Sequence, residues 1–260
     1  MIEFIRKMGP FSLKEIWFSE DVYDVEDVDA IQFKNTSFSG DKPGFTKEPS
    51  TTLVLDLSRS LEDIFNSMDK KTCRHQITKA VDEGTVIKFN DRFPEFYEIN
   101  KEFRKYKGLT PFIIEPEELK KNYILATYER DGKVLGGHLC IKDDRHIRQL
   151  ISASTMNWEP GISRSIFGRG NRLSIWELIK YAKQEGLQEY DFGGYATGQL
   201  GEELKGINEF KAGFGGHVCE KFSYSKNYSR SYSASKSVYL SAISAGQKIK
   251  RIGKKKKDGS

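Results

Sequence analysis

Cysteine and histidine are scarce in this chain of 260 residues, which contains 3 cysteines and 4 histidines. The cysteines Cys73, Cys140 and Cys219 lie far apart, and no pair has the C-x-x-C spacing of a zinc or redox motif. Their odd number and wide spacing predict reduced thiols in an intracellular protein rather than a disulfide framework. The three cysteines and four histidines show no metal-ligand spacing, so the sequence predicts no metal site.

Long apolar runs are also missing. The first ten residues contain no apolar segment long enough for a signal peptide, and no run elsewhere is long enough to span a bilayer. No Ser-His-Asp or Cys-His set can be assembled, which argues against a triad-type nucleophile. The sequence therefore predicts a cytoplasmic protein.

The composition is that of a folded protein with unevenly placed charge. Hydrophobic residues make up 37% and aromatic residues 12%, which is enough for a core in one large domain or a domain with an attached subdomain. The net charge is +5. Acidic residues gather early, at Glu20, Asp21, Asp24, Glu26, Asp27 and Asp29. Basic residues gather at the end, at Lys248, Lys250, Arg251 and 254–257. This tail is either a solvated terminus or a contact for tRNA or for an anionic membrane surface at the cytoplasmic face.

Hydrophobic periodicity and turn residues predict alternating strands and helices from residue 51 onward. Strands are predicted at 51–57, 85–89, 187–192 and 217–224, with a three-stranded meander over 123–154. Helices are predicted from Ser60 to Gly84, with a capping box of Ser60 and Asp63 at the start, and at 93–107, 173–184 and 206–212. The first turn of the meander is predicted at Arg130-Asp131-Gly132. The aromatic stripe of the second helix is expected to be core, and Gly136-Gly137 indicates a bulge in the meander. For residues 1–50 the sequence predicts an irregular region with one or two strands.

Two short glycine-containing blocks stand out. Residues 190–194, Tyr-Asp-Phe-Gly-Gly, predict a strand that ends on paired glycines. Residues 206–216 place Lys211 between Phe210 and Phe214, close to three glycines. A lone cation beside aromatic rings and permissive backbone suits an anionic ligand or a developing negative charge. The alternative is a glycine-rich turn with packed phenylalanines and a solvated lysine.

A basic segment precedes the predicted helix 173–184. It contains Arg164, Gly168, Arg169, Gly170, Asn171 and Arg172. We expect a loop here whose backbone N–H groups, together with the helix N-terminus, bind an anion. A flexible basic loop without a ligand is the alternative.

The two glycine blocks resemble the closing motif of the Fem-type (FemABX) peptidyltransferases and of related BioF2-like acyltransferases, in the Gcn5-related N-acetyltransferase (GNAT) superfamily. The resemblance is good over 172–222, fair over 51–84 and absent before residue 51. It implies an α/β (α+β) acyltransferase fold with a mixed, mostly antiparallel central sheet flanked by helices. The implied organisation is an irregular region at 1–50, a GNAT-like domain at 51–226 and a basic, partly helical tail at 227–260.

The resemblance also implies an activity. An activated acyl group would move from acyl-CoA or aminoacyl-tRNA, as a co-substrate rather than a bound cofactor, to an amine on a cell-envelope precursor or a nucleotide-sugar. Proximity and oxyanion stabilisation would do most of the catalysis. The alternatives are an aminoacyl-tRNA-dependent peptidyltransferase acting on a peptidoglycan-type precursor and a non-catalytic polyanion-binding module.

The resemblance assigns roles to residues of three kinds. Catalytic roles fall on Lys211, Asp191 and Tyr190. Lys211 would neutralise charge on the donor phosphate or the tetrahedral intermediate. Asp191 would orient or deprotonate the attacking amine, and the alternative is that it caps the glycine turn. Donor phosphates would be bound by Arg164, Gly168, Arg169, Gly170, Asn171 and Arg172, although this Arg-x-x-x-Gly-x-Gly pattern is one residue longer than the family's. Substrate contacts are implied for Lys71, Arg74, Gly193, Gly194, Phe210 and Phe214.

Overall fold

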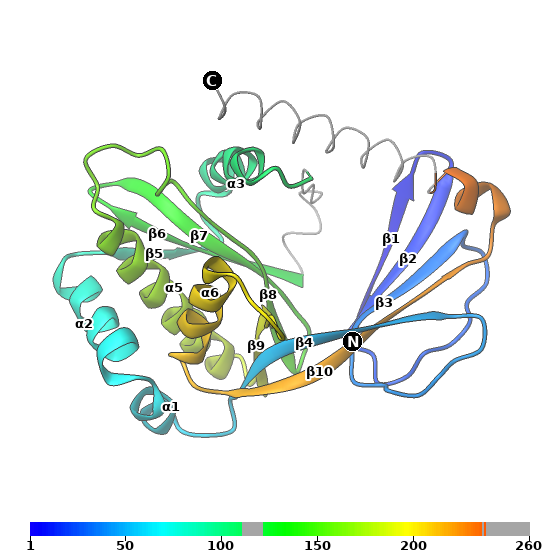
Figure 1. The fold of residues 1–260 in the computed structure, drawn as a ribbon, viewed down its shortest axis with the longest axis horizontal. Helices are drawn as coiled ribbons and strands as arrows, with labels where there is room; N and C mark the ends of the chain where they lie inside the picture. Colours follow the sequence, from blue (N-terminus) through cyan, green and yellow to red (C-terminus); the bar gives the residue numbers. More distant parts are fainter. Residues whose placement is uncertain (111–121, 236, 238–260) are drawn as a thin grey trace. The chain divides into compact units, whose positions relative to one another are not determined.

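The computed structural model describes residues 1–110, 122–235 and 237, and its chain divides into two compact units (Figure 1). Unit 1 comprises Met1–Pro49 with Lys221–Ser260, and unit 2 comprises Ser50–Glu220. Two strands, β4 (Thr46–Asp56) and β10 (His217–Asn227), begin in one unit and end in the other. None of the helices in these described residues is long and apolar enough to cross a membrane.

Unit 1 contains more regular structure than the sequence predicted for residues 1–50. Strands β1 (Ile2–Met8), β2 (Phe11–Trp17) and β3 (Ala30–Thr36) precede β4, so the expectation of an irregular region with one or two strands was wrong. β1 pairs with β2 antiparallel, β2 with β3 parallel, and β3 with β10 antiparallel. The strands of this region are completed by pairing with β10, which comes from the far end of the chain. A local pattern in residues 1–50 does not reveal this distant partner.

The C-terminal segment is described only at its start. Residues 230–235 are helical, and Tyr232 packs with Leu13 and Ala30 in a small core of unit 1. The basic tail residues from Lys248 onward lie outside the described residues.

Unit 2 is built on a mixed sheet in the order β4-β9-β8-β7-β6-β5. Its other strands are β5 (Val86–Phe89), β6 (Tyr123–Arg130), β7 (Lys133–Lys142), β8 (His146–Ser154) and β9 (Glu189–Gly194). All neighbouring pairs described are antiparallel except β8 with β9. The predicted mixed, mostly antiparallel sheet and its β6–β8 meander are therefore confirmed. The hairpin between β6 and β7 turns on Asp131 and Gly132, both at positive φ.

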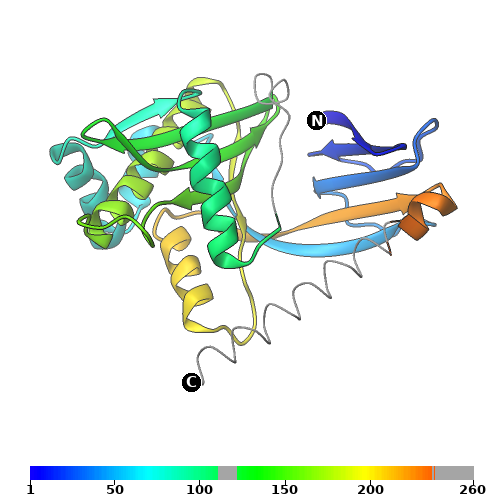
Figure 2. The ribbon, with the colours of Figure 1, turned by 90° about the horizontal axis from the view of Figure 1, so that it is seen from above.

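Helices pack on both faces of this sheet (Figures 1 and 2). α3 (Phe93–Lys107) packs on β7 and β8, and α5 (Arg164–Gln184) packs on β5, β6 and β7. Gly137 faces Phe96 of α3, whereas its strand neighbour Cys140, three positions on, joins the core under α5. This core contains Leu55, Ile124, Ile175 and many other apolar side chains.

The segment from Ser60 to Gly84 is not one helix as predicted. It forms α1 (Leu61–Ser67), a π-helical turn η1 (Lys70–Arg74) and α2 (His75–Asp82). The Ser60 hydroxyl caps α1 by accepting from the N–H of Asp63, as the sequence predicted. Asp69 then caps a new start, because its carboxylate accepts from the N–H groups of Lys71 at 3.0 Å and Thr72 at 2.6 Å.

The basic segment 164–172 is helical, which corrects the prediction of a loop. α5 begins at Arg164 rather than at residue 173, so both Gly168 and Gly170 lie within the helix. Glycine lowers helix propensity, but tertiary packing overrides it here. A side chain at Gly170 would place its Cβ 2.5 Å from the ring of buried Tyr128, so the glycine permits close packing of helix on sheet.

Candidate active site

The strands β8 and β9 part in the middle of the unit 2 sheet. Their parallel pairing ends at Arg148 and Asp191, while β8 continues to Ser154 and β9 to Gly194. The register of β8 against β7 also shifts between Gln149 and Ile151. We call the parted segments, 149–154 of β8 and 192–194 of β9, the wedge. Strand edges in the wedge carry backbone N–H and C=O groups that this parallel pairing does not use.

A cleft of about 560 Å³ opens at the wedge and lies wholly within unit 2. Both wedge segments line it, together with residues of α3 and of α6 (Glu202–Ala212). Its aromatic lining consists of Phe103, Tyr106, Tyr128, Phe192 and Phe210. Its polar lining includes Lys107, Gln149, Asn171, Glu203 and Lys211. A cleft with an apolar body and a few convergent polar groups is the usual form of a small-ligand site.

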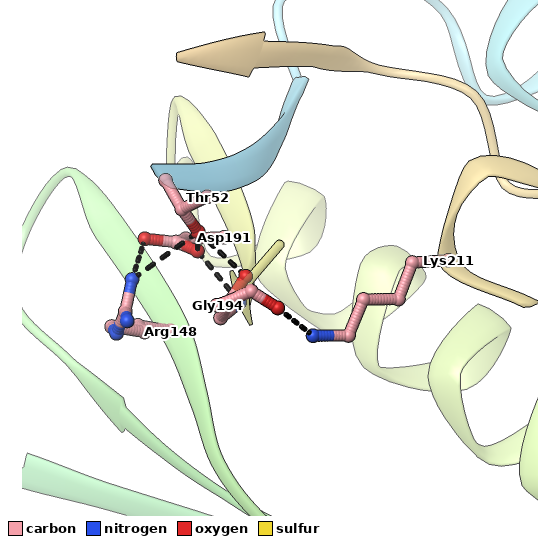
Figure 3. A network of polar contacts seen from close by, with 6 residues as sticks. Thr52, Arg148, Asp191, Gly194 and Lys211 are labelled. Atoms are coloured by element: carbon pink, nitrogen blue, oxygen red, sulfur yellow. Dashed lines mark hydrogen bonds and ion pairs between the residues drawn. The ribbon is translucent and has the colours of Figure 1, made fainter. Parts of the chain in front are cut away.

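Asp191 fixes the end of β9 beside the cleft (Figure 3). Its Oδ2 forms an ion pair with Arg148, and its Oδ1 accepts from the N–H of Gly193 at 2.7 Å and from the Thr52 hydroxyl. Only 2% of Asp191 is exposed. Both carboxylate oxygens therefore hold protein groups, so Asp191 anchors the glycine turn; the predicted role as a base for the attacking amine does not fit this placement.

Position 193 requires a residue without a side chain. Its φ is +77°, and an added Cβ would lie 3.1 Å from the backbone oxygen of Gln149 on β8. The glycine therefore lets β9 turn tightly while it approaches β8 at the apex of the wedge. The carbonyl of the next residue, Gly194, is then presented to α6.

Lys211 extends from the last turn of α6 into this arrangement. Its Nζ donates to the carbonyl oxygen of Gly194 at 2.6 Å (Figure 3). Burial lowers the pKa of Lys211 to about 8, an effect opposed by the negative charge of Asp191 and reinforced by the positive charge of Arg148. Within the described residues no carboxylate forms an ion pair with it. A partly desolvated cation with no direct counter-charge is arranged to attract an anionic group.

Helix α6 is itself fixed on both sides. Phe214, fully buried just after the helix, packs against Phe192 and Phe210, with ring centroids 5.4 and 5.6 Å apart. The side chain of Asn208 binds the backbone of Ala196, donating at 2.8 Å and accepting at 3.2 Å. These contacts set the position of Lys211, and they make Phe214 a core residue rather than a substrate contact.

The other predicted site residues divide between the cleft wall and other places. Gly193, Gly194, Phe210, Lys211 and Asn171 line the cleft. Tyr190 does not: it is fully buried in the core, and burial raises its pKa well above the usual value. Its position therefore corrects the predicted catalytic role. Lys71 is exposed on η1 and Arg74 contacts Asn66 there, and neither lines the cleft.

The predicted phosphate-binding residues on α5 are largely engaged within the protein. Arg169 forms an ion pair with Glu83 at 2.8 Å. Arg172 donates to the carbonyl of Gly168 at 3.0 Å and lies over the Phe210 ring, 4.6 Å from its centroid. Arg164 at the first turn is exposed. The structure therefore brings Arg172 and Asn171 near the cleft but commits Arg169 to a contact with the end of α2.

Several functional residues were missed by sequence reasoning. Thr52, Arg148 and Gln149 lie on strands, where single polar residues are common and carry no motif. Phe103 and Tyr106 were predicted to be core because they continue the stripe of α3. Phe96 and Ile99 are buried, but Tyr106 is 61% exposed, and both Phe103 and Tyr106 line the cleft. The stripe was a correct signal of a helix, but it did not reveal that α3 extends past the core to the cleft.

Residues 115–211 match the family model Acetyltransf_6, described as an acetyltransferase (GNAT) domain. In structure the chain is similar to FemX, with 16% sequence identity, a TM-score of 0.63, and coverage of 86% of this chain and 83% of that one. It is also similar to the C-terminal domain (DUF2156) of a putative lysylphosphatidylglycerol synthetase from Agrobacterium fabrum, with 13% identity, a TM-score of 0.52, and coverage of 87% and 80%. No curated protein sequence matches the chain.

Residues 115–211 therefore match the GNAT family model, and the chain has a fold similar to that of FemX. The resemblance to the Fem-type and BioF2-like branch of this superfamily, inferred from the two glycine blocks, is confirmed.

Proposed function

We propose that this protein is an acyltransferase that moves an activated acyl group to an amine on a cell-envelope precursor or an activated sugar. One observation carries the proposal: the wedge between β8 and β9 opens a cleft whose wall holds Lys211, a partly desolvated cation without a direct counter-charge. Unpaired strand edges suit an extended donor arm, and the cation suits its reacting carbonyl or a phosphate.

The chemistry requires a neutral amine, an acyl carbonyl and an oxyanion site. The amine nitrogen bonds to the acyl carbon, and the bond from that carbon to the thioester sulfur or ester oxygen breaks. The proton that the nitrogen loses ends on the leaving sulfur or oxygen, so the products are an amide and a free thiol or hydroxyl. Lys211 faces the carbonyl oxygen of Gly194 and supplies positive charge for the tetrahedral intermediate. Asp191 and Thr52 act as positioning residues, because they hold the backbone that Lys211 contacts.

Two donors remain in the proposal, acyl-CoA and aminoacyl-tRNA. The likeness to FemX and to a putative lysylphosphatidylglycerol synthetase domain favours the aminoacyl donor and an envelope acceptor. Donor phosphates would lie at the exposed first turn of α5, where Arg164 is available and Arg169 is not. Unit 2 would be the catalytic domain, and the cytoplasm, including the inner face of the membrane, its location.

The proposal is tested by calorimetric titration of the protein with acetyl-CoA and, in parallel, with charged tRNA. Saturable binding of acetyl-CoA makes this an acyl-CoA enzyme, and binding of charged tRNA alone assigns it to the aminoacyl-transfer branch. Lys211→Ala should weaken donor binding, and Lys205→Ala is its matched control. Lys205 is an exposed lysine of the same helix, and among the described residues it forms an ion pair with Glu202. Absence of binding to both donors would contradict the proposed function.

A further inference from the structure

A buried polar cluster lies behind the cleft, on β7, β8 and α5. His138 of β7 is fully buried, and its Nδ1 lies 2.9 Å from Nε2 of Gln149 on β8. Asn171 of α5 contacts the same ring. Gln149 and Asn171 both line the cleft, whereas His138 does not. The cluster therefore connects the interior of the sheet to the ligand site.

The protonation state of His138 fixes the orientation of Gln149. Burial lowers the pKa of His138 to about 4, although the backbone and side chain of Asn171 act to raise it, so the ring is neutral at neutral pH. The side-chain Nε2 of Gln149 can only donate, so its 2.9 Å contact requires a bare Nδ1, and the proton of the neutral ring lies on Nε2. The bare Nδ1 then accepts, and the Gln149 amide must donate to it.

This leaves the other end of the Gln149 amide without a partner. Its Oε1 is buried and accepts no hydrogen bond from any residue that the structure describes, and the same holds for Oδ1 of Asn171. Buried acceptors without donors are unfavourable and are rare in folded proteins. Gln149 follows directly after Arg148, where β8 and β9 part, and the residue lines the cleft at this point.

We propose that Gln149, held by neutral His138, is a specificity-determining residue that accepts a hydrogen bond from an N–H group of the bound substrate. This inference rests on the proposed function. The N–H group has two sources: the attacking amine of the acceptor or an amino substituent on the transferred acyl group. A hydrocarbon acyl group combined with an acceptor that has no amine offers no N–H group to Oε1 of Gln149. We therefore expect the enzyme to discriminate against this combination of substrates.

The first test uses small probes that do not depend on turnover. The side-chain amide signal of Gln149 is followed by nuclear magnetic resonance while alaninamide or propionamide is added; the two probes differ by one amino group. We expect a saturable shift with alaninamide that is at least roughly tenfold weaker with propionamide, because a site built for a donor rejects the analogue that lacks it. Equal responses to both probes, or none, would overturn the inference.

The second test separates the two sources. Alanyl and propionyl donors on the same carrier are compared with one acceptor, and an amine acceptor is compared with its alcohol analogue using one donor. Gln149→Met, which keeps the length but removes the amide, should reduce one of the two selectivity ratios to within about twofold of unity. Gln149→Glu, which keeps an acceptor oxygen, should retain it. The selectivity ratio that falls to near unity identifies whether the N–H group comes from the donor or from the acceptor.

Outcomes of the two proposals can be told apart. A protein that binds neither acetyl-CoA nor charged tRNA contradicts the acyltransferase, whatever Gln149 does with the probes. An active enzyme whose selectivity ratios are both unchanged in Gln149→Met contradicts only the role of Gln149. Thermal unfolding of each variant shows that it is folded. His138→Gln, which removes the imidazole that holds the Gln149 amide but leaves Gln149 itself, should lower the same ratio without removing the kcat for the preferred substrate.

Discussion

Two segments of unit 2, 164–172 and 206–216, both place basic residues beside glycines, but the surroundings of their cations differ. Around Lys211 the cation has no direct counter-charge, is partly desolvated, and lies on the wall of the cleft. Around Arg169 the cation is neutralised by Glu83 and lies within a helix. The difference comes from neighbours that are distant in the sequence. A basic residue beside glycines becomes a functional candidate only where the fold withholds a carboxylate from it.

The largest effect is expected at Lys211. Lys211→Ala should lower kcat/KM by about 10²–10³-fold, the usual loss when one group that stabilises an oxyanion is removed. Steady-state kinetics with the donor that binds provides the measurement. Lys205→Ala, on the same helix, should keep activity within about twofold, since exposed ion pairs contribute little. Equal losses of activity in both variants would contradict the role of Lys211 in stabilising the oxyanion.

The next effect concerns the anchor beneath Lys211. Asp191→Asn leaves Arg148 without its buried counter-charge and should lower the free energy of unfolding by about 3 kcal/mol. It should also lower the pKa of Lys211 further, because the charge of Asp191 raises that pKa. Chemical denaturation measures the first effect, and Glu202→Gln at an exposed ion pair should change stability by less than about 1 kcal/mol. A stability change as small as that of Glu202→Gln would show that Asp191 is not a structural anchor.

The two glycines of the α5 segment should respond with opposite signs. Gly170→Ala forces a Cβ to 2.5 Å from the Tyr128 ring and should cost about 1–3 kcal/mol of stability. Gly168→Ala meets only the end of the Arg172 side chain, at 3.5 Å, and should stabilise the helix by about 0.5–1 kcal/mol. Thermal unfolding of both variants measures the pair. Loss of donor binding in a stable Gly168→Ala protein would return this segment to the role of a phosphate loop.

The pH dependence of donor binding tests the charge of Lys211. Its pKa is lowered to about 8, so the cation is present below that pH and is lost as the pH rises through it. Donor affinity should therefore fall above pH 8, approaching about tenfold per pH unit if binding requires the cation. Binding is measured rather than turnover, because the attacking amine must lose a proton and gains reactivity with rising pH. Lys211→Arg should keep its affinity at high pH; a fall identical to that of the unaltered protein would assign the titration to another group.

The smallest effect is expected at Arg169. Arg169→Ala should leave donor affinity within about twofold and reduce stability by about 1 kcal/mol or less, because Glu83 keeps a second partner in Arg130 at 3.6 Å. Calorimetric titration and thermal unfolding provide the two readings. Arg172→Ala is a useful companion, since its guanidinium lies over Phe210 on the cleft wall. A large loss of donor affinity in Arg169→Ala would mean that the ion pair with Glu83 opens to bind the donor.

Sequence patterns predicted those parts of the molecule whose causes are local. The hairpin at Asp131-Gly132, the cap at Ser60 and the helix 93–107 all depend on a few adjacent residues, and all three occur. The two glycine blocks were each recognised from local sequence, but the contact between Lys211 and Gly194 that joins them was found only in the structure. The roles of Arg148 and Thr52 could not be predicted, because each meets Asp191 only after the sheet is assembled.

At the start of α5 the local sequence predicted a loop where the structure has a helix. Gly168 and Gly170 have low helix propensity, so their local signal favoured a loop. Packing of Gly170 on Tyr128 and pairing of Arg169 with Glu83 supply what the local sequence lacks. Both partners are more than 40 positions away, as the sequence numbering shows.

Hydrogen–deuterium exchange with and without a saturating donor tests the central claim most directly. If the donor lies in the wedge, protection should appear at 149–154 of β8 and 192–194 of β9, where the strands part. Lys211→Ala should reduce that protection at the same donor concentration, and Lys205→Ala should not. Protection confined to 164–172, or to unit 1, with the wedge unchanged would contradict the account.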